Sequence, residues 1–348
     1  MSQGKQAAVT TRVALAGFGA WGQMHARAIA AIAGAQVVAV LARSEAARAA
    51  VAQMLPAARV YTDYAALLAD PGIDVVNVLL PNDAHAASAV AALDAGKHVL
   101  LEKPLGLTLQ QCDQVARAAR RNARLVAVNH ELRVSRQWGA VHAMVAQGDI
   151  GRVRHQHLAL FRKPFRTGSG GWRYDPQRVG SWVLEELVHF IDLVLWYGQS
   201  SGHPARVHAF GTGADTGLSD NFSVVLEWDD GATAVLNQCL AGFEHHSLLE
   251  VAGTTGAIRT WWSGAMDRTD TPSFELRVRR GDAEPQTIAI PFSGEVFELE
   301  ENLRLAYQGF AAGTSILSAE QARASVAVSL AAEQAWRERR PVQLTPVA

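Results

Sequence analysis

The first third of the chain alternates short hydrophobic runs with longer alanine-rich segments. The runs lie at residues 13–16, 37–41, 59–61, 75–80, 99–101 and 125–128. Helices are predicted between them at 25–33, 64–69 and 84–95, and from a capping box at Thr108 and Gln111 to about Asn122. Continuous apolar runs are typical of parallel strands buried on both faces, so this alternation predicts an α/β fold with a doubly wound parallel sheet.

After Gly151 the pattern changes, because strand-like runs now follow one another. They lie at residues 153–161, 206–210, 222–228, 232–240, 248–253, 257–262, 274–280 and 287–290. Short turns between several of them are typical of an antiparallel sheet, and two helices at about 298–309 and 319–337 close the chain. We therefore predict a second, α+β domain. A broad sheet with an apolar outer face commonly forms an oligomer interface, which favours a homodimer or homotetramer.

Composition narrows the class of partner. With 348 residues, 49% of them hydrophobic, the chain can bury two cores. The net charge of -1 is spread without long blocks of one sign and no apolar run could span a bilayer, so we expect a small-molecule partner rather than nucleic acid or membrane. Cys112 and Cys239 lack metal-type spacing, and the first eleven residues lack an export signal, which together predict a cytoplasmic protein.

A glycine-rich turn joins the first predicted strand to the first predicted helix. It consists of Gly17, Phe18, Gly19, Ala20, Trp21 and Gly22. Gly17 permits the tight turn, Gly19 lets a pyrophosphate approach the backbone, and Gly22 lets the helix pack closely on the strand. Because a strand, a helix and a second strand surround it at the right distances, the turn predicts a dinucleotide site at the helix N-terminus.

The residues after the second predicted strand bear on the choice of cofactor. An NAD site is expected to place a carboxylate here for the ribose hydroxyl, but none occurs before Glu45. Arg43 and Ser44 offer a cation and a hydroxyl, which suit the 2′-phosphate of NADP. NADP is therefore favoured and NAD stays open, since Arg43 also fits an ordinary exposed position.

One lysine stands between apolar neighbours at a predicted strand end, in the run Leu-Leu-Glu-Lys-Pro-Leu at 100–105. Partial burial would lower the pKa of Lys103 toward neutrality, as proton exchange with a substrate requires. We predict that Lys103 is the proton-transfer residue, and that Glu102 and Lys103 border the cofactor. The alternative is a lysine that extends to solvent and pairs with Glu102.

Polar residues follow two other predicted strands, where the crevice of a doubly wound sheet should lie. Pro81, Asn82 and His85 are predicted to bind the cofactor, and Asn129 and Arg133 the substrate. Two alternatives stay open: Asn82 can simply cap a helix, and the residues around Asn129 can form an ordinary turn.

The predicted helix at 180–197 is apolar except for Glu185, Glu186, His189 and Asp192. Their spacing places Glu185, His189 and Asp192 on one face. Because buried ionisable groups are costly unless paired or functional, His189 is predicted to bind a substrate hydroxyl, with Glu185 or Asp192 fixing its tautomer. An internal hydrogen-bonded triad is the alternative. A metal site is not expected, since no further ligand motif stands nearby.

Trp172 and Arg173 follow a glycine-rich loop at 168–171. An aromatic ring and a cation in a loop can cover a sugar or hold a phosphate, so both are predicted to bind substrate. A surface loop without a ligand is the alternative. Four further histidines are expected to be strand residues rather than metal ligands, namely His155, His157, His245 and His246.

Several separated motifs together resemble the Gfo/Idh/MocA family of sugar and cyclitol dehydrogenases over nearly the whole chain. They are the glycine turn with His25, Pro81-Asn82-x-x-His85, the run from Ala95 into Glu102-Lys103-Pro104, the helix carrying His189 and Asp192, and Gly253-Thr254-Thr255-Gly256. The resemblance implies a Rossmann domain at 1–128 that binds NAD(P). It also implies a substrate-binding and oligomerisation domain at 129–348, whose closing helices can pack back on the first.

The same resemblance implies oxidation or reduction of a ring alcohol of a sugar, cyclitol or related polyol. In the family, the lysine of Glu-Lys-Pro is the general acid/base, and an aspartate four residues before a histidine assists it. Lys103 and His189 match these positions. Glu185 stands where the aspartate is expected and Leu187 where a glycine is usual, so Glu185, or else Glu186, would take the aspartate's role.

Two other activities stay open on this fold. One is a nicotinamide-dependent glycosidase or epimerase that works by transient oxidation. The other is a non-catalytic regulator that senses the cofactor. A regulator has no need of a proton-transfer lysine, so Lys103 together with His189 argues against it.

Overall fold

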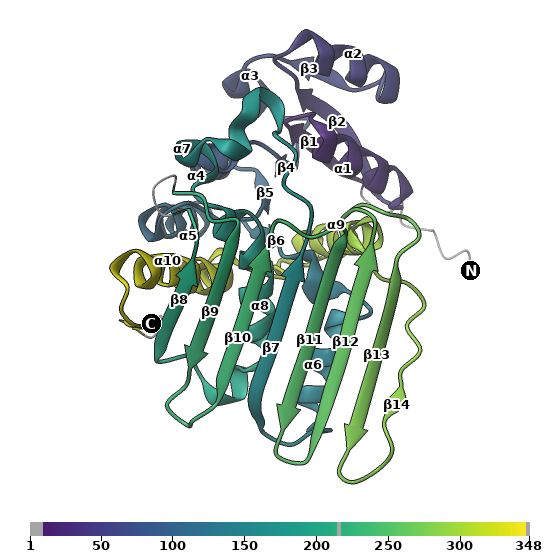
Figure 1. Ribbon diagram of the computed structural model, residues 1–348. Helices are drawn as coiled ribbons and strands as arrows, with labels where there is room; N and C mark the ends of the chain where they lie inside the picture. Colours follow the sequence, from purple (N-terminus) through teal and green to yellow (C-terminus); the bar gives the residue numbers. More distant parts are fainter. Residues whose placement is uncertain (1–9, 214–216, 346–348) are drawn as a thin grey trace, which may run out of the picture.

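The computed structural model describes residues 10–213 and 217–345 (Figure 1). The first eleven residues were predicted to lack an export signal, and residues 1–9 of them lie outside the described residues. The first half of the chain forms a six-stranded parallel sheet in the order β3-β2-β1-β4-β5-β6. Its strands are β1 (Thr11–Ala16), β2 (Ala35–Leu41), β3 (Arg59–Tyr61), β4 (Val75–Val78), β5 (His98–Glu102) and β6 (Val126–Asn129). The predicted doubly wound sheet is confirmed.

Helices join these strands and cover the sheet. They are α1 (Ala20–Ala31), α2 (Glu45–Met54), α3 (Tyr64–Leu68), α4 (Asn82–Asp94) and α5 (Leu109–Arg121). Every residue of β4 is buried between β1 and β5, which is why the sequence shows a continuous apolar run there. The strand order reverses between β1 and β4, and ligands of such sheets bind where the order reverses, outside the carboxyl ends of the strands.

The second half forms a nine-stranded sheet in the order β14-β13-β12-β11-β7-β10-β9-β8-β15. Its strands are β7 (Val153–Phe161), β8 (Arg206–Gly211), β9 (Asn221–Glu227), β10 (Thr233–Cys239), β11 (His245–Gly253), β12 (Gly256–Gly264), β13 (Ser273–Arg280), β14 (Gln286–Thr287) and β15 (Val342–Gln343). The predicted antiparallel sheet is confirmed, with one exception: β7 pairs with β10 in parallel. The sheet is mixed because β7, first in sequence, lies between β11 and β10.

Helices cover one face of this sheet, and Figure 1 shows α6 (Trp138–Ala146) and α8 (Val188–Tyr197) behind it. The closing helices α9 (Glu295–Ala312) and α10 (Ala319–Glu338) return to the first sheet. On α9, Leu299, Leu303 and Tyr307 join the core around β1. On α10, Ala322 and Val326 join the core around β5. The two halves of the chain are thus packed together around the carboxyl ends of the parallel strands.

Candidate active site

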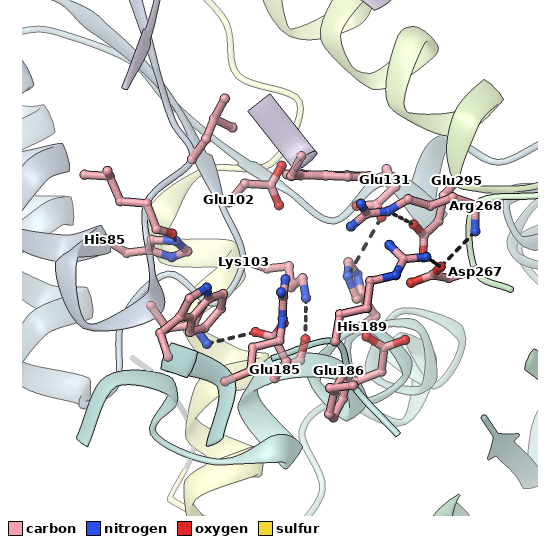
Figure 2. Close-up of a pocket in the computed structure, with 18 of the residues that line it drawn as sticks. His85, Glu102, Lys103, Glu131, Glu185, Glu186, His189, Asp267, Arg268 and Glu295 are labelled. Atoms are coloured by element: carbon pink, nitrogen blue, oxygen red, sulfur yellow. Dashed lines mark hydrogen bonds and ion pairs between the residues drawn. The ribbon is translucent and has the colours of Figure 1, made fainter. Parts of the chain in front are cut away.

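A polar pocket of about 110 Å³ lies between the two sheets, at the carboxyl ends of β4 and β5. The first half of the chain contributes Trp21, Asn82, His85, Glu102 and Lys103. The part of the chain after the parallel sheet contributes Glu131, Trp172, Arg173, Glu185, Glu186 and His189. Figure 2 shows Lys103 at the centre of these side chains. The size of the pocket suits a small polar molecule rather than a polymer.

The glycine turn at the N-terminus of α1 has the geometry that a dinucleotide needs. Gly17 has φ +115°, a conformation that side chains disfavour, and a Cβ on Gly22 would lie 2.4 Å from the carbonyl oxygen of Gly17. By contrast, a Cβ on Gly19 would meet no heavy atom within 4 Å in the part of the chain that the structure describes. Gly17 and Gly22 are therefore required by the chain's own packing, whereas the space at Gly19 is open to a ligand.

These residues fit a dinucleotide. The backbone of the glycine turn and the N-terminus of α1 would hold the pyrophosphate. Trp21 and Lys103 both line the pocket, which places the turn and the chemistry at one site. A bound nicotinamide dinucleotide would supply the hydride acceptor or donor.

Lys103 is anchored by the second half of the chain. Its Nζ donates to the backbone carbonyl oxygen of Glu185. Burial alone would lower the pKa of Lys103, but the surrounding carboxylates, first of all Glu185 and Glu186, raise it above its usual value. The expected lowering of this pKa was therefore wrong for the free protein, because the pocket places several negative charges around the amine. The ammonium form is the stable one.

Glu102 does not pair with Lys103 as the alternative interpretation held. Its Oε1 accepts from His25 Nε2 at 3.0 Å and from Asn129 Nδ2 at 2.6 Å. The tautomer of His25 follows from Asn77, whose amide nitrogen lies 3.2 Å from Nδ1 and can only donate. Glu102 thus ties the sheet to α1 in a buried polar network, and leaves the neighbouring lysine to face the pocket.

Glu185 connects the two halves of the chain. Its Oε1 accepts from Arg173 Nε at 2.6 Å, and its Oε2 accepts from Asn82 Nδ2 at 3.0 Å. Burial raises the pKa of Glu185, but Lys103 and Arg173 more than offset it, so the net pKa lies below the usual value. Asn82 does not cap α4, which begins at Asn82 after an N-cap at Pro81. Pro81 does not line the pocket, whereas Asn82 does.

The helix carrying His189 differs from the prediction. Residues Val183–Leu187 form a π-helical turn, η3, and α8 begins only at Val188. The wider turn breaks the four-residue register, so Glu185 and His189 reach the pocket side by side while Asp192 does not line it. Among the described residues, no hydrogen bond or ion pair joins the His189 ring to Glu185 or Asp192, so the expectation that one of them fixes its tautomer was wrong.

The carboxylate nearest to His189 is Glu131, on the 3₁₀ turn η1 (Glu131–Val134), with Oε1 3.8 Å from Nε2. Burial, with help from Lys103 and His130, holds the pKa of His189 well below its usual value. The imidazole is therefore neutral at physiological pH. Glu131 stood in a polar run after a predicted strand, but nothing in the sequence singled it out.

Three predicted substrate residues lie outside the pocket lining. Arg133 forms a bidentate pair with Asp192, at 2.6 and 2.9 Å. Asn129 donates to Glu102 and accepts from Asn302 Nδ2 at 2.5 Å. The polar atoms of these three side chains are thus used within the protein, and Asn129 holds the pocket residue Glu102 in place.

His85 and the pair Arg43 and Ser44 have different surroundings. Both ring nitrogens of His85 lie 2.8 Å from carbonyl oxygens, those of Pro104 and Leu80, and burial lowers its pKa. His85 thus joins the segments that follow β4 and β5, while its ring lines the pocket. Arg43 and Ser44 are exposed at the end of β2, and the Ser44 side chain caps α2 by accepting from Ala47 N.

Sequence patterns missed a second group of charged residues in the pocket. Arg162 binds Glu186 at 2.7 Å and Asp267 at 3.4 Å, and its guanidinium is buried. Arg268 stacks over the Trp21 ring at 4.5 Å and lies 3.7 Å from Glu295. They come from the residue after β7, from the segment after β12 and from the start of α9, and no local pattern marks them because only the fold brings them together.

The predicted substrate residues Trp172 and Arg173 both line the pocket. The Arg173 guanidinium lies 4.5 Å from the Trp172 ring centroid and binds Glu185, so the loop that carries them is attached to the pocket wall. Among the described residues no group of three or more histidine, cysteine or acidic side chains is placed to hold a metal ion. Within the same residues, no helix has the length and apolar character needed to cross a membrane.

Glu295 in this pocket is expected to make the stability of the folded protein depend on pH. Burial, with Asp267 and Glu186 nearby, raises the pKa of Glu295 from 4.5 to about 8. The folded state therefore keeps a proton that the unfolded state has lost, and stability decreases as pH rises from about 4.5 to 8. A fully buried carboxyl would contribute roughly 1.4 kcal/mol per pH unit. The Glu295 side chain is 23% exposed, so we expect a smaller slope.

Urea unfolding at pH 5, 6, 7 and 8 measures this contribution. Relative to wild type, E295Q is expected to lose less stability toward pH 8, because glutamine cannot ionise. Identical pH slopes in the two proteins would show that Glu295 is already ionised at neutral pH in the folded state.

The sheet order, the glycine turn and a lysine beside an imidazole in one cleft define a dinucleotide-dependent oxidoreductase of the dehydrogenase or reductase class. The family model described as "Oxidoreductase family, NAD-binding Rossmann fold" matches residues 11–130, and that of the GFO/IDH/MocA C-terminal domain matches 138–259. The chain belongs to the GFO/IDH/MocA oxidoreductase family.

Named relatives are similar over most of their length. The inositol 2-dehydrogenase of Acidothermus cellulolyticus is 30% identical over 72% of this chain and 72% of that protein. The 1,5-anhydro-D-fructose reductase of Ensifer adhaerens is 29% identical over 73% of this chain and 75% of that protein. A levoglucosan dehydrogenase solved with NADH and levoglucosan has the same fold, with TM-score 0.83, 20% identity and coverage of 96% of this chain and 99% of that one.

Proposed function

We propose that this protein transfers a hydride between a nicotinamide dinucleotide and a secondary alcohol on the ring of a sugar, cyclitol or related polyol. The observation that carries the proposal is the meeting of Lys103 and His189 in one polar pocket beside the glycine turn. Relatives named for inositol and for 1,5-anhydro-D-fructose support the substrate class.

Lys103 would act as the general acid/base. Its raised pKa keeps it an ammonium, which donates a proton to a carbonyl oxygen during reduction. For alcohol oxidation it must first lose that proton. The neutral imidazole of His189 would orient the same oxygen, and the Glu185 carbonyl oxygen positions the amine.

The test is a substrate panel. Purified protein is assayed with monosaccharides, inositols and anhydrosugars in the oxidative direction, and with their ketones in reverse, using NAD(H) and NADP(H). The proposal predicts stoichiometric formation or loss of reduced cofactor with one group of these compounds. Cleavage or epimerisation without net change in the cofactor would support the glycosidase or epimerase alternative instead. Binding of the cofactor without any turnover would support a regulator.

We propose that NADP is the preferred cofactor. Arg43 and Ser44 are exposed where β2 ends, and a guanidinium there can bind a 2′-phosphate. R43A is expected to raise KM for NADP by about tenfold, a loss of roughly 1.4 kcal/mol, and to leave KM for NAD nearly unchanged. Steady-state kinetics with both cofactors measure the ratio. Equal changes for both would mean that Arg43 does not contact the 2′ position.

We also propose a cytoplasmic homodimer or homotetramer assembled through the nine-stranded sheet. Val225, Val235, Leu248 and Trp261 are partly exposed on strands at the middle of the sheet, and Figure 1 shows no helix over that face among the described residues. L248R would bury a charge in the interface and is expected to lower the mass seen by light scattering. An unchanged mass in L248R, or a monomeric wild type, would contradict this assembly.

A further inference from the structure

Glu131 is a buried carboxyl group that faces the proposed catalytic imidazole. It lies directly after β6 and His130, on η1, and only 4% of the residue is exposed. Its Oε1 lies 3.8 Å from His189 Nε2, and both side chains line the pocket (Figure 2). Both residues follow the parallel sheet in sequence, and they lie in the same pocket as Lys103.

Neither side chain of this pair has its hydrogen-bonding capacity satisfied. The distance of 3.8 Å exceeds that of a hydrogen bond. Glu131 Oε2 and His189 Nδ1 are buried without a hydrogen-bond partner among the residues that the structure describes. The atoms that face one another are Oε1 and Nε2, and the 3.8 Å between them leaves room for a ligand oxygen that hydrogen-bonds to both.

The protonation states of the pair suit a neutral ligand. Burial, with Glu102 and Glu295 nearby, raises the pKa of Glu131 well above its usual value, and Lys103 only partly opposes this. Burial therefore favours the protonated form of Glu131, in which a carboxyl group can both donate and accept a hydrogen bond. Because His189 is also neutral, the pair offers donors and acceptors without net charge, as a hydroxyl group requires.

We propose that Glu131 is a substrate-binding residue which, together with His189, holds one hydroxyl group of the substrate and so selects polyols that carry a hydroxyl there. An oxygen about 2.8 Å from both Oε1 and Nε2 fits between atoms 3.8 Å apart. This inference rests on the proposed function, since it names a determinant of substrate choice at the same site.

A bound water is the competing explanation for the gap between Oε1 and Nε2. Glu131 and His189 also line a second cavity of about 40 Å³, which is room for about one water molecule. A water would satisfy the pair in every complex and would give Glu131 a structural role only. The experiment therefore measures selectivity among substrates rather than activity alone.

The test compares E131Q and E131M with wild type, using the best polyol from the panel and its monodeoxy analogues. Wild type is expected to discriminate against one analogue by about 100-fold or more in kcat/KM. That analogue lacks the hydroxyl group held by Glu131 and His189, and so leaves buried polar groups unpaired. E131M should lose about 100-fold on the parent polyol and discriminate against that analogue less than tenfold. E131Q should stay within about tenfold of wild type, since an amide also donates and accepts.

E333Q is the matched control, because Glu333 is a buried carboxyl on α10 whose pKa burial also raises, and it does not line the pocket. Its selectivity should equal that of wild type. Thermal unfolding and cofactor binding show whether each variant folds. If E131M does not fold, the discrimination of wild type between the parent polyol and its monodeoxy analogues tests the proposal.

Unchanged discrimination in a folded E131M would overturn the inference while the proposed function stands. A wild type that turns over every monodeoxy analogue as well as the parent polyol would overturn the inference too, whether or not E131M folds. A wild type that binds the cofactor but turns over no polyol or ketone would overturn both.

Discussion

Replacing Lys103 with methionine is expected to lower kcat by about 10²- to 10⁴-fold, the contribution of a positioned acid/base. Methionine fills a similar volume but cannot exchange a proton, and the Glu185 carbonyl oxygen loses its donor. Cofactor binding should persist, because the glycine turn and α1 are untouched. The measurements are kcat with saturating polyol and NADP, together with a fluorescence titration of the reduced cofactor.

K163M is the matched control for this variant. Lys163 is exposed on the segment after β7 and does not line the pocket, so its kcat should match wild type. Normal turnover in K103M would remove Lys103 from the mechanism. Loss of turnover together with loss of cofactor binding would indicate a damaged fold, and thermal unfolding would distinguish that case.

Two substitutions three residues apart in the glycine turn, G19A and G22A, are expected to give opposite results. In G19A the new methyl group meets no heavy atom of the described residues within 4 Å apart from its chain neighbours, so stability should equal that of wild type. The methyl group would stand where the pyrophosphate approaches, and dinucleotide affinity should decrease by about 10- to 100-fold, roughly 1.4 to 2.8 kcal/mol. Calorimetric titration with NAD and NADP measures this loss.

G22A is the contrasting variant. Its Cβ would lie 2.4 Å from the Gly17 carbonyl oxygen, so helix and strand must separate, and overpacking of this kind costs about 1–3 kcal/mol or more. We expect a lower midpoint of urea unfolding in G22A but not in G19A. Wild-type affinity in G19A would show that the dinucleotide does not approach this turn.

The sequence placed the lysine and the imidazole well because local patterns mark them. Lys103 ends a buried strand, and His189 interrupts an apolar helix. The partners of these residues could not be predicted in the same way. Helical periodicity favoured Glu185 or Asp192 beside His189. The π-helical turn changes the register, however, and Asp192 forms an ion pair with Arg133. Contacts such as these depend on residues far apart in sequence.

The pKa of Lys103 likewise could not be predicted from local sequence alone. Its neighbours in sequence indicate burial, which lowers an ammonium pKa, whereas the fold surrounds it with carboxylates that outweigh burial. Periodicity and turn chemistry are local, so the amino-acid sequence by itself determined the two sheets, the dinucleotide turn and the candidate proton-transfer lysine. Only the tertiary structure decided which charges face that lysine and that Glu131 faces His189, because electrostatic and hydrogen-bonding partners are set by distances across the cleft.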